Sequence, residues 1–146
     1  MSGNCTEVTT DKLIFVEEHK RKVVFRNPCG RVYRKTIVDG CLIQDGIRAD
    51  YLVSEAKSAS VIVELNGSCV EHACEQLFVT AEHPSIKPLL EVKIGFIVMC
   101  SKYPRFDTFV RKAKDRCRKK YKCGFHVVCT RREFDIDRVV AIDGPY

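Results

Sequence analysis

The sequence has no hydrophobic run long enough to cross a membrane. No stretch of the 146 residues approaches the roughly 18 to 20 consecutive apolar residues that a membrane span requires. Residues 1–12 are polar and lack the apolar block of a secretory signal. We therefore expect a soluble protein that does not bind membranes and stays in the cytoplasm.

The cysteines form no CxxC pair, the spacing that lets one turn present two thiolates to zinc. Their number, nine, is odd, and the chain is long enough to bury a core without disulfides. We predict reduced thiols that act mainly as small buried hydrophobic side chains. The cysteines are Cys5, Cys29, Cys41, Cys69, Cys74, Cys100, Cys117, Cys123 and Cys129.

Internal repeats, low-complexity tracts and linker-like segments are also missing. The composition, 45% hydrophobic and 30% charged residues, is that of an ordinary globular protein. Residues 1–146 are therefore predicted to form a single domain.

The first half of the chain predicts a series of short strands. Runs rich in β-branched and aromatic residues occur at 13–18, 22–27, 31–38 and 49–54, separated by the turn signals NPCG, VDG and QDG. A further run, residues 61–66, stays apolar until Glu64, as expected of a buried strand that ends in a polar site.

The second half predicts helices that alternate with strands. Ser68 begins an S-x-x-E capping box, so a helix is expected to start there. Strands are expected at residues 92–100 and 125–130, with a helix at about 106–121 between them that Gly124 closes. Strand-helix-strand units favour parallel pairing, so we predict an α/β fold: a mixed central sheet, strand-rich in its N-terminal half and flanked by helices.

The most informative polar residues are Asp50, Glu64, Asn66 and Gln76. Glu64 and Asn66 lie two apart on a strand and share one face. A hairpin folded about Lys57 would place Asp50 opposite Glu64, with Cβ atoms about 4.5 to 5.5 Å apart. Carboxylates that close repel unless a cation or proton intervenes, and oxygen ligands suit Mg²⁺ or Mn²⁺. Asp50 and Glu64 are therefore predicted to bind one of these metals.

An aspartate, a later E-x-N and a following helix with a glutamine resemble the motif of the PD-(D/E)xK nuclease superfamily, especially its RecB-like and resolvase-like members. The resemblance covers roughly residues 48–80. It implies a restriction-endonuclease-like fold and metal-dependent hydrolysis of phosphodiester bonds in DNA. By position, Asp50 and Glu64 would be the metal ligands and Gln76 a supporting amide.

Asn66 stands where the superfamily has its catalytic lysine. An asparagine amide donates hydrogen bonds but supplies no positive charge. Lys93, on the strand after the helix, is the first candidate to replace that lysine, and Lys57, in a turn, is the second. The substitution also supports a second hypothesis, a catalytically inactive nuclease-fold module that binds nucleic acid or a protein partner without cleavage.

Three further residues are weaker candidates for the site. Many superfamily members place an additional acid before the aspartate, and Glu17 and Glu18 are candidates, although we do not predict either one individually. His72 lies one helical turn before Gln76, where it could contact the site, but an exposed helix histidine is the stronger expectation.

Acidic residues are scarce between residues 105 and 122. This segment holds nine basic and two acidic residues, whereas the rest of the chain holds 16 and 17. On a helix, the apolar residues between Phe106 and Tyr121, Phe109 included, form one stripe for the core, which directs the basic residues outward. The outward-facing residues proposed to bind nucleic acid are Arg111, Lys112, Lys114, Arg118, Lys119 and Lys122.

This excess of positive charge predicts contact with a polyanion. Like charges at i and i+4, such as Lys114 and Arg118, repel in the free helix, and a phosphate backbone would relieve that repulsion. No zinc finger, recognition helix or RNP motif is present, so we expect recognition of backbone or shape, in DNA rather than RNA. A plain solvated helix face, docking on an acidic protein and formation of a homodimer stay open as alternatives.

Overall fold

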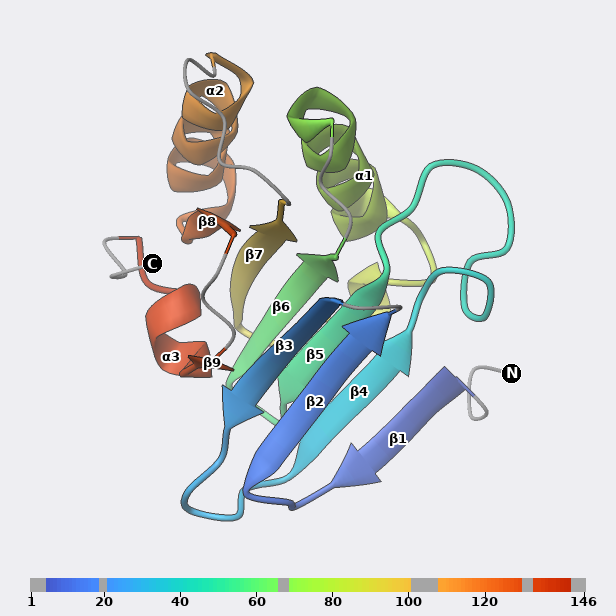
Figure 1. Cartoon of the computed structure of the whole chain (residues 1–146), viewed down its shortest axis with the longest axis vertical. Coiled ribbons are helices and arrows are strands. Elements are labelled where there is room, and N and C mark those ends of the chain that lie inside the picture. Colours follow the sequence, from blue (N-terminus) through green and yellow to red (C-terminus); the bar gives the residue numbers. More distant parts are fainter. Residues whose placement is uncertain (1–4, 19–20, 66–68, 101–107, 130–132, 143–146) are drawn as a thin grey trace.

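The computed structural model describes residues 5–18, 21–65, 69–100, 108–129 and 133–142, which form two β-sheets and flanking helices (Figure 1). The larger sheet has the order β1 (Thr6–Thr9), β4 (Tyr33–Ile37), β5 (Tyr51–Glu55), β6 (Ala59–Glu64), β7 (Lys93–Met99) and β8 (Phe125–Val128). The smaller sheet has the order β2 (Leu13–Glu18), β3 (Arg21–Arg26) and β9 (Glu133–Phe134). The helices are α1 (Val70–Glu82), α2 (Thr108–Arg116) and α3 (Ile136–Val139), with a 3-10 turn η2 (Lys87–Leu89) and a π-helical segment η3 (Cys117–Tyr121).

The larger sheet is mixed, as predicted. β1, β4, β5 and β6 pair antiparallel, whereas β6, β7 and β8 pair parallel. The connection from β6 to β7 contains α1, and that from β7 to β8 contains α2, because parallel neighbours need a crossover long enough to return the chain. The α/β class and the strand-rich N-terminal half are confirmed.

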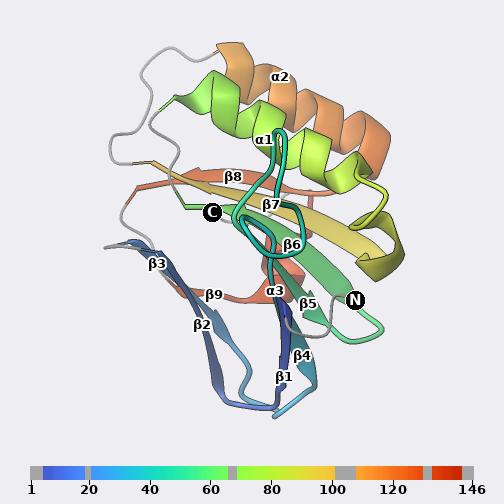
Figure 2. The ribbon, with the colours of Figure 1, turned by 90° about the vertical axis from the view of Figure 1, so that its right-hand side faces the viewer.

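The larger sheet lies between two cores. Helices α1 and α2 cover one face, and the smaller sheet and α3 lie against the other (Figure 2). Along β6, Ile62 faces the helix core, whereas Val61 and Val63 face the second core. Because both faces are covered, every residue of β6 is buried, which explains its nearly continuous apolar sequence.

Strands β2 and β3 do not join the central sheet. They form a hairpin that pairs with β9 instead, so the expectation of one sheet holding all the strands is wrong. Along β2, Ile14 and Val16 are buried against the central sheet, whereas Leu13 and Phe15 are exposed. β2 thus has only one buried face, as expected of a strand in a covering layer and unlike the doubly covered β6.

Both long helices have capping residues that differ from the predicted ones. Helix α1 has Cys69 at its N-cap with no side-chain cap, and the expected start, Ser68, lies outside the described residues. Helix α2 continues into η3, which ends at Tyr121 as predicted, but its C-cap is Lys122, whose φ of 52° is left-handed, and not Gly124. No helix in the described part of the chain is long and apolar enough to cross a membrane.

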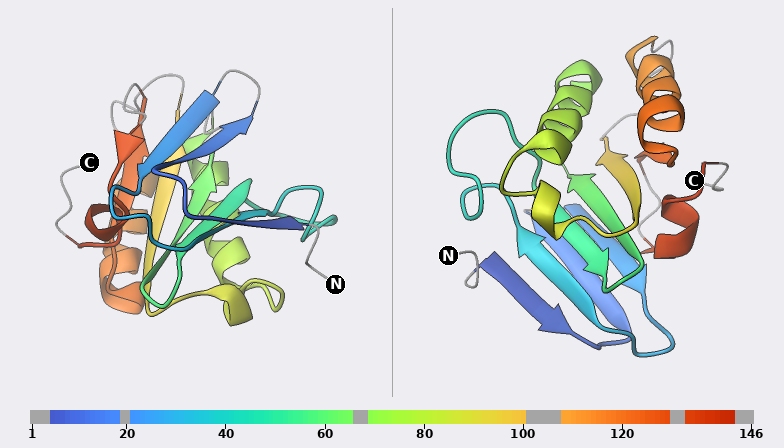
Figure 3. Two further views of the ribbon diagram at one scale, coloured as in Figure 1. Left: turned by 90° about the horizontal axis from the view of Figure 1, so that it is seen from below. Right: turned by 180° about the vertical axis from the view of Figure 1, so that it is seen from behind.

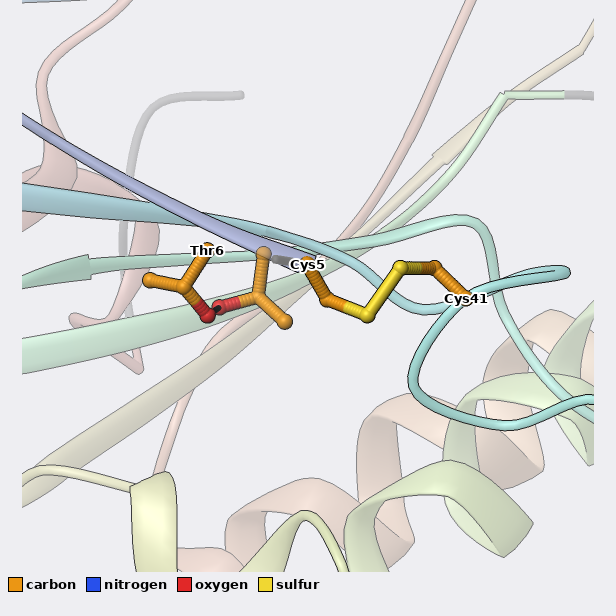
Figure 4. Close-up of a disulfide and its surroundings, with 4 residues drawn as sticks. Cys5, Thr6 and Cys41 are labelled. Carbon is orange, nitrogen blue, oxygen red and sulfur yellow. Dashed lines mark hydrogen bonds between the residues drawn. A yellow bond between two sulfur atoms is a disulfide. The ribbon is translucent and has the colours of Figure 1, made fainter. Parts of the chain in front are cut away.

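One pair of cysteines contradicts the expectation of reduced thiols. Cys5 and Cys41 form a disulfide that joins the start of β1 to the loop after β4 (Figure 4). The other cysteines are thiols, and Cys74, Cys100, Cys117 and Cys123 are buried, as predicted for small hydrophobic side chains. Sequence spacing gave no sign of the disulfide, because its partners are 36 residues apart and meet only when β1 pairs with β4.

Gly124 is required for close packing at the start of β8. An added Cβ would lie 2.4 Å from the carbonyl oxygen of Val139 and 2.5 Å from that of Ala141. These are backbone atoms, so relief requires the chain near α3 to move. We therefore expect Gly124→Ala to lower the free energy of unfolding by about 1 to 3 kcal/mol in urea titrations. Lys122→Gly is the control, because glycine adopts a left-handed conformation freely and should cost little there; equal losses in both variants would contradict the packing argument.

Candidate metal centre

The β5–β6 hairpin has the predicted register. Ser54 pairs with Ser60, and the turn contains Lys57 with a φ of 66°. The regular ladder ends at Tyr51 and Val63, one residue short of the expected pair of acids. Asp50 directly precedes β5 and Glu64 is the last residue of β6, so the two acids come at neighbouring ends of adjacent strands.

Asp50 is held beside the end of β6 by its backbone and its side chain. Its N–H donates to the carbonyl of Val63 (3.1 Å), and its Oδ2 accepts from the N–H of Leu65 (2.8 Å). Asp50 is 7% exposed and Glu64 is 3% exposed, and both line the same pocket. The two predicted acids therefore lie in one pocket.

Helix α1 fixes the two residues before Asp50. The Gln76 side chain donates to the carbonyl of Arg48 (2.9 Å), and the Thr80 hydroxyl accepts from the N–H of Ala49 (2.7 Å). Gln76 also lines the pocket. Its place next to the site agrees with the supporting role expected from the sequence, and its described contact is with backbone.

The tightest group of acids, however, is Glu18, Asp39 and Asp50. Their carboxylates each offer an oxygen, and these oxygens lie within 4.8 Å of one another. Glu64 is not part of this group, although it lines the pocket. The sequence thus predicted one member of the cluster, Asp50, and missed Asp39. Glu18 was one of two candidates for an additional acid, neither of which was predicted individually.

Three separate elements bring these acids together. Glu18 ends β2, and the Tyr51 hydroxyl donates to the carbonyl of the preceding Glu17 (3.0 Å), which ties the smaller sheet to β5. Asp39 follows β4 in the loop that lies beside α1 (Figure 3). Arg48 forms an ion pair with Asp39 (2.7 Å) and so holds the two sides of this loop together.

The acids line a pocket of about 300 Å³ at the carboxyl end of β6. Its walls come from both sheets and from α1, and the described residues among them include a single basic side chain. The lining residues are Glu18, Arg21, Asp39, Asp50, Glu64, Leu65 and Gln76.

Burial and like charge change the protonation of Glu18. Desolvation, a hydrogen bond with Asp50 and the negative charges of Asp50 and Asp39 raise the pKa of Glu18 to about 7. A proton therefore relieves the repulsion between these acids near neutral pH. A divalent cation would do the same, and a donor set made only of carboxylate oxygens fits a hard cation such as Mg²⁺ or Mn²⁺.

Other predicted site residues lie elsewhere. Lys93 is exposed and pairs with Ala59 at the opposite end of β6, about 16 Å from Glu64 at 3.3 Å per residue, so the structure does not bring it to the pocket. Lys57 occupies the turn at that same far end. His72 is exposed and does not line the pocket, and Asn66 lies outside the described residues.

The basic residues of α2 and η3 face outward, as predicted. Arg111, Lys112, Lys114, Arg118, Lys119 and Lys122 are all exposed. Val110, Ala113 and Cys117 face the helix core, but Phe109 is 42% exposed, so its place in the core stripe is wrong; Phe106 lies outside the described residues.

Acids compensate part of this charge. Lys119 pairs with Asp115 one turn earlier (3.0 Å), and Lys120 pairs with Glu82 at the end of α1 (3.3 Å). The Tyr121 hydroxyl also donates to Glu82, and these contacts, led by the tyrosine, lower the pKa of Glu82 to about 2. The end of the segment is thus tied to α1, while Arg111, Lys112 and Lys114 belong to its first half.

The chain matches no protein-family model, no curated protein and no solved structure.

The raised pKa of Glu18 predicts how stability depends on pH. Between about pH 4.5 and 7 the folded protein keeps a proton on Glu18 that the unfolded chain releases, so stability falls as the pH rises through this window. In metal-free buffer with chelator, we expect the thermal midpoint to decrease over this range, and to decrease less in Glu18→Gln. Glu17→Gln, one residue away and exposed, should keep the wild-type slope; a Glu18→Gln slope identical to wild type would contradict the proton-sharing argument.

Proposed function

We propose that this chain is a divalent-metal-dependent nuclease that hydrolyses phosphodiester bonds in DNA and has a restriction-endonuclease-like fold. The observation that carries the proposal is the convergence of Glu18, Asp39 and Asp50 in a pocket that Glu64 also lines. Acids this close are unfavourable without a proton or a cation, so their arrangement favours a cation site.

The place of the pocket in the fold agrees with this proposal. Ligands of open α/β sheets bind at the carboxyl ends of parallel strands, and Glu64 ends β6 directly before the crossover to α1. The superfamily motif likewise places its acids on adjacent strands before a helix that carries the glutamine. Gln76 meets that pattern, since it lies on α1 and lines the pocket.

The residues around the pocket can each be given a part in this chemistry. A bound Mg²⁺ or Mn²⁺ would polarise the phosphodiester and lower the pKa of a coordinated water. Asp50, fixed by the N–H of Leu65, would be the rigid ligand. Glu18 would lose its proton when the cation binds, and Gln76 would keep the strand before Asp50 in place.

Removal of either central acid should abolish cleavage. We expect Asp50→Asn and Glu64→Gln to reduce the rate of plasmid nicking in Mg²⁺ or Mn²⁺ by about a hundredfold or more. Both substitutions keep the shape of the side chain, and circular dichroism checks the fold.

Exposed acids and lysines of the same chain provide the controls. Asp45→Asn changes an exposed acid on the loop before Asp50, and Lys93→Gln changes the lysine that the sequence favoured. Both should cleave like the wild type. Undiminished cleavage by Asp50→Asn and Glu64→Gln would refute the proposal, because the activity would then come from elsewhere.

A second candidate function is a catalytically inactive module of the same fold that binds nucleic acid. No lysine of the described residues lines the pocket, and Asn66 occupies the motif position, which favours this candidate. The exposed basic residues on α2 would then carry the function by contacting the phosphate backbone.

Salt-dependent binding distinguishes the parts of the basic segment. We expect anisotropy titrations of a labelled DNA duplex to show binding that weakens with salt and that falls further in Arg111→Gln/Lys112→Gln than in Arg118→Gln/Lys119→Gln. The first pair lies on the first half of α2, whereas Lys119 already pairs with Asp115. Lys12→Gln/Lys93→Gln removes two exposed lysines that lie outside the basic segment and is the charge-matched control. If this control loses as much affinity for the duplex as Arg111→Gln/Lys112→Gln, α2 is not the binding surface. Strong cleavage created by Asn66→Lys would favour the inactive module over the nuclease.

A further inference from the structure

Arg21 is the one basic residue among the described residues that line the acidic pocket. It begins β3 and pairs directly with Glu18 at the end of β2. Directly opposed residues of an antiparallel pair point to the same face. Their face is the inner one, because Val16 and Val23, the next residues of that face, are both buried in the core between the sheets.

The surroundings of Arg21 differ from those of other arginines near acids. Arg26, Arg34 and Arg48 form ion pairs with Asp135, Glu91 and Asp39, respectively. In the described part of the chain, Arg21 forms no ion pair, although four carboxylates line the same pocket. A partly buried guanidinium beside acids that nevertheless pairs with none of them has its donors available for another anion.

A ligand for this arrangement must satisfy both charges at once. Its anionic oxygens would have to reach both the cation held by the acids and the Arg21 guanidinium, which lines the same pocket. A phosphodiester has two such oxygens on one phosphorus, and a guanidinium can bind them with two parallel hydrogen bonds. A carboxylate also binds a guanidinium in this way, but the metal-dependent hydrolysis proposed above acts on phosphate.

We propose that Arg21 binds the phosphate of the substrate at the metal centre and provides the positive charge that residue 66 does not. This inference rests on the proposed function. Arg21 would contribute no proton, because a guanidinium keeps its charge at all relevant pH values. It would hold the phosphate against the metal and stabilise negative charge on its oxygens.

Phosphorus relaxation tests this role without relying on catalysis. The probe is the dinucleotide thymidylyl-thymidine, which has one phosphodiester and is too short to span α2 as well. Paramagnetic Mn²⁺ bound by the acids shortens the phosphorus relaxation time only if the phosphate lies next to it. Mn²⁺ binding itself is measured separately by calorimetry.

We expect the wild type to bind Mn²⁺ and to show the relaxation effect. Arg21→Gln should bind Mn²⁺ at least as tightly, because a positive charge has left the pocket, but should bind the dinucleotide about tenfold more weakly or worse. Arg21→Lys should restore part of the affinity. Lys22→Gln is the matched control: Lys22 is adjacent on β3, pairs with Glu17 and lies over the ring of Phe15 on the outer face, so it should behave like the wild type.

The role of Arg21 and the metal centre can be refuted separately. If Arg21→Gln binds Mn²⁺ and the dinucleotide like the wild type, the role of Arg21 is refuted and the metal centre stands. If Arg21→Gln loses Mn²⁺ as well, Arg21 shapes the pocket and does not bind phosphate, which also refutes the role. If the wild type binds no Mn²⁺, the proposed function and this inference are both refuted.

Discussion

The candidate site depends on the way in which the chain is held just before β5. Asp50 donates its N–H to the end of β6 and accepts a hydrogen bond from Leu65, so it cannot move away from that strand. The preceding residues are bound to α1 through Gln76 and Thr80. Since Thr80 is fully buried and its hydroxyl also donates to the carbonyl of Gln76, the helix and the strand entry form one rigid unit. An acid on such a unit can be placed against other acids despite their mutual repulsion.

That repulsion has to be offset by the packing of the two sheets. Glu18 reaches the pocket because β2 lies on the second core, with Ile14 and Val16 buried on the same face. Burying those two side chains contributes roughly 1.5 to 3 kcal/mol each. Apolar contacts elsewhere on β2 therefore hold Glu18 close to Asp50, although the two carboxyl groups repel each other when both are charged. Strain of this kind is expected at functional sites, since a stability-optimised strand would end in a neutral residue.

The parts of the site that follow from local sequence were predictable. The hairpin about Lys57 was found with its register, because strand alternation and turn position determine which residues face each other. The position of α1 after β6 was predicted from another local signal, the S-x-x-E pattern that begins at Ser68. These two features were sufficient to bring Asp50, Glu64 and Gln76 into one pocket.

Residues supplied by long-range packing were not predictable in the same way. Asp39 belongs to the turn signal VDG, which looks like any surface turn. It lies beside Asp50 because the pairing of β4 with β5 continues past Ile37, and the N–H of Asp39 donates to the carbonyl of Asp50 (3.2 Å). Glu18 did leave a trace, because it continues the buried alternation of Ile14 and Val16, and an acid at an inward position needs a partner. Nothing in the spacing of residues indicated that β2 and β3 would form a separate sheet. Because Arg21 reaches the pocket only from that sheet, there was no reason in the sequence to predict it as a site residue.

The orientation of the two long helices links the pocket to the basic surface. Helices α1 and α2 follow the parallel strands β6 and β7 and lie side by side on one face of the sheet (Figures 2 and 3). Their C-terminal ends are fastened together by Tyr121 and Lys120 on Glu82. Their N-terminal ends therefore both lie toward the carboxyl edge of the sheet, where Glu64 and the other acids are.

In this geometry the two halves of the basic segment lie at different distances from the acidic pocket. Lys119 lies eight positions after Arg111, about 12 Å further from the carboxyl edge at 1.5 Å per residue, and it is already paired with Asp115. Arg111 and Lys112 lie nearer that edge. A nucleic acid strand whose phosphate occupies the acidic pocket would continue over the first half of α2 before reaching the second. In the proposed function, the acids and the basic helix, which are separate in the sequence, would contact one extended polyanion: the acids through a cation, Arg21 directly and the helix by neutralising the phosphates beyond.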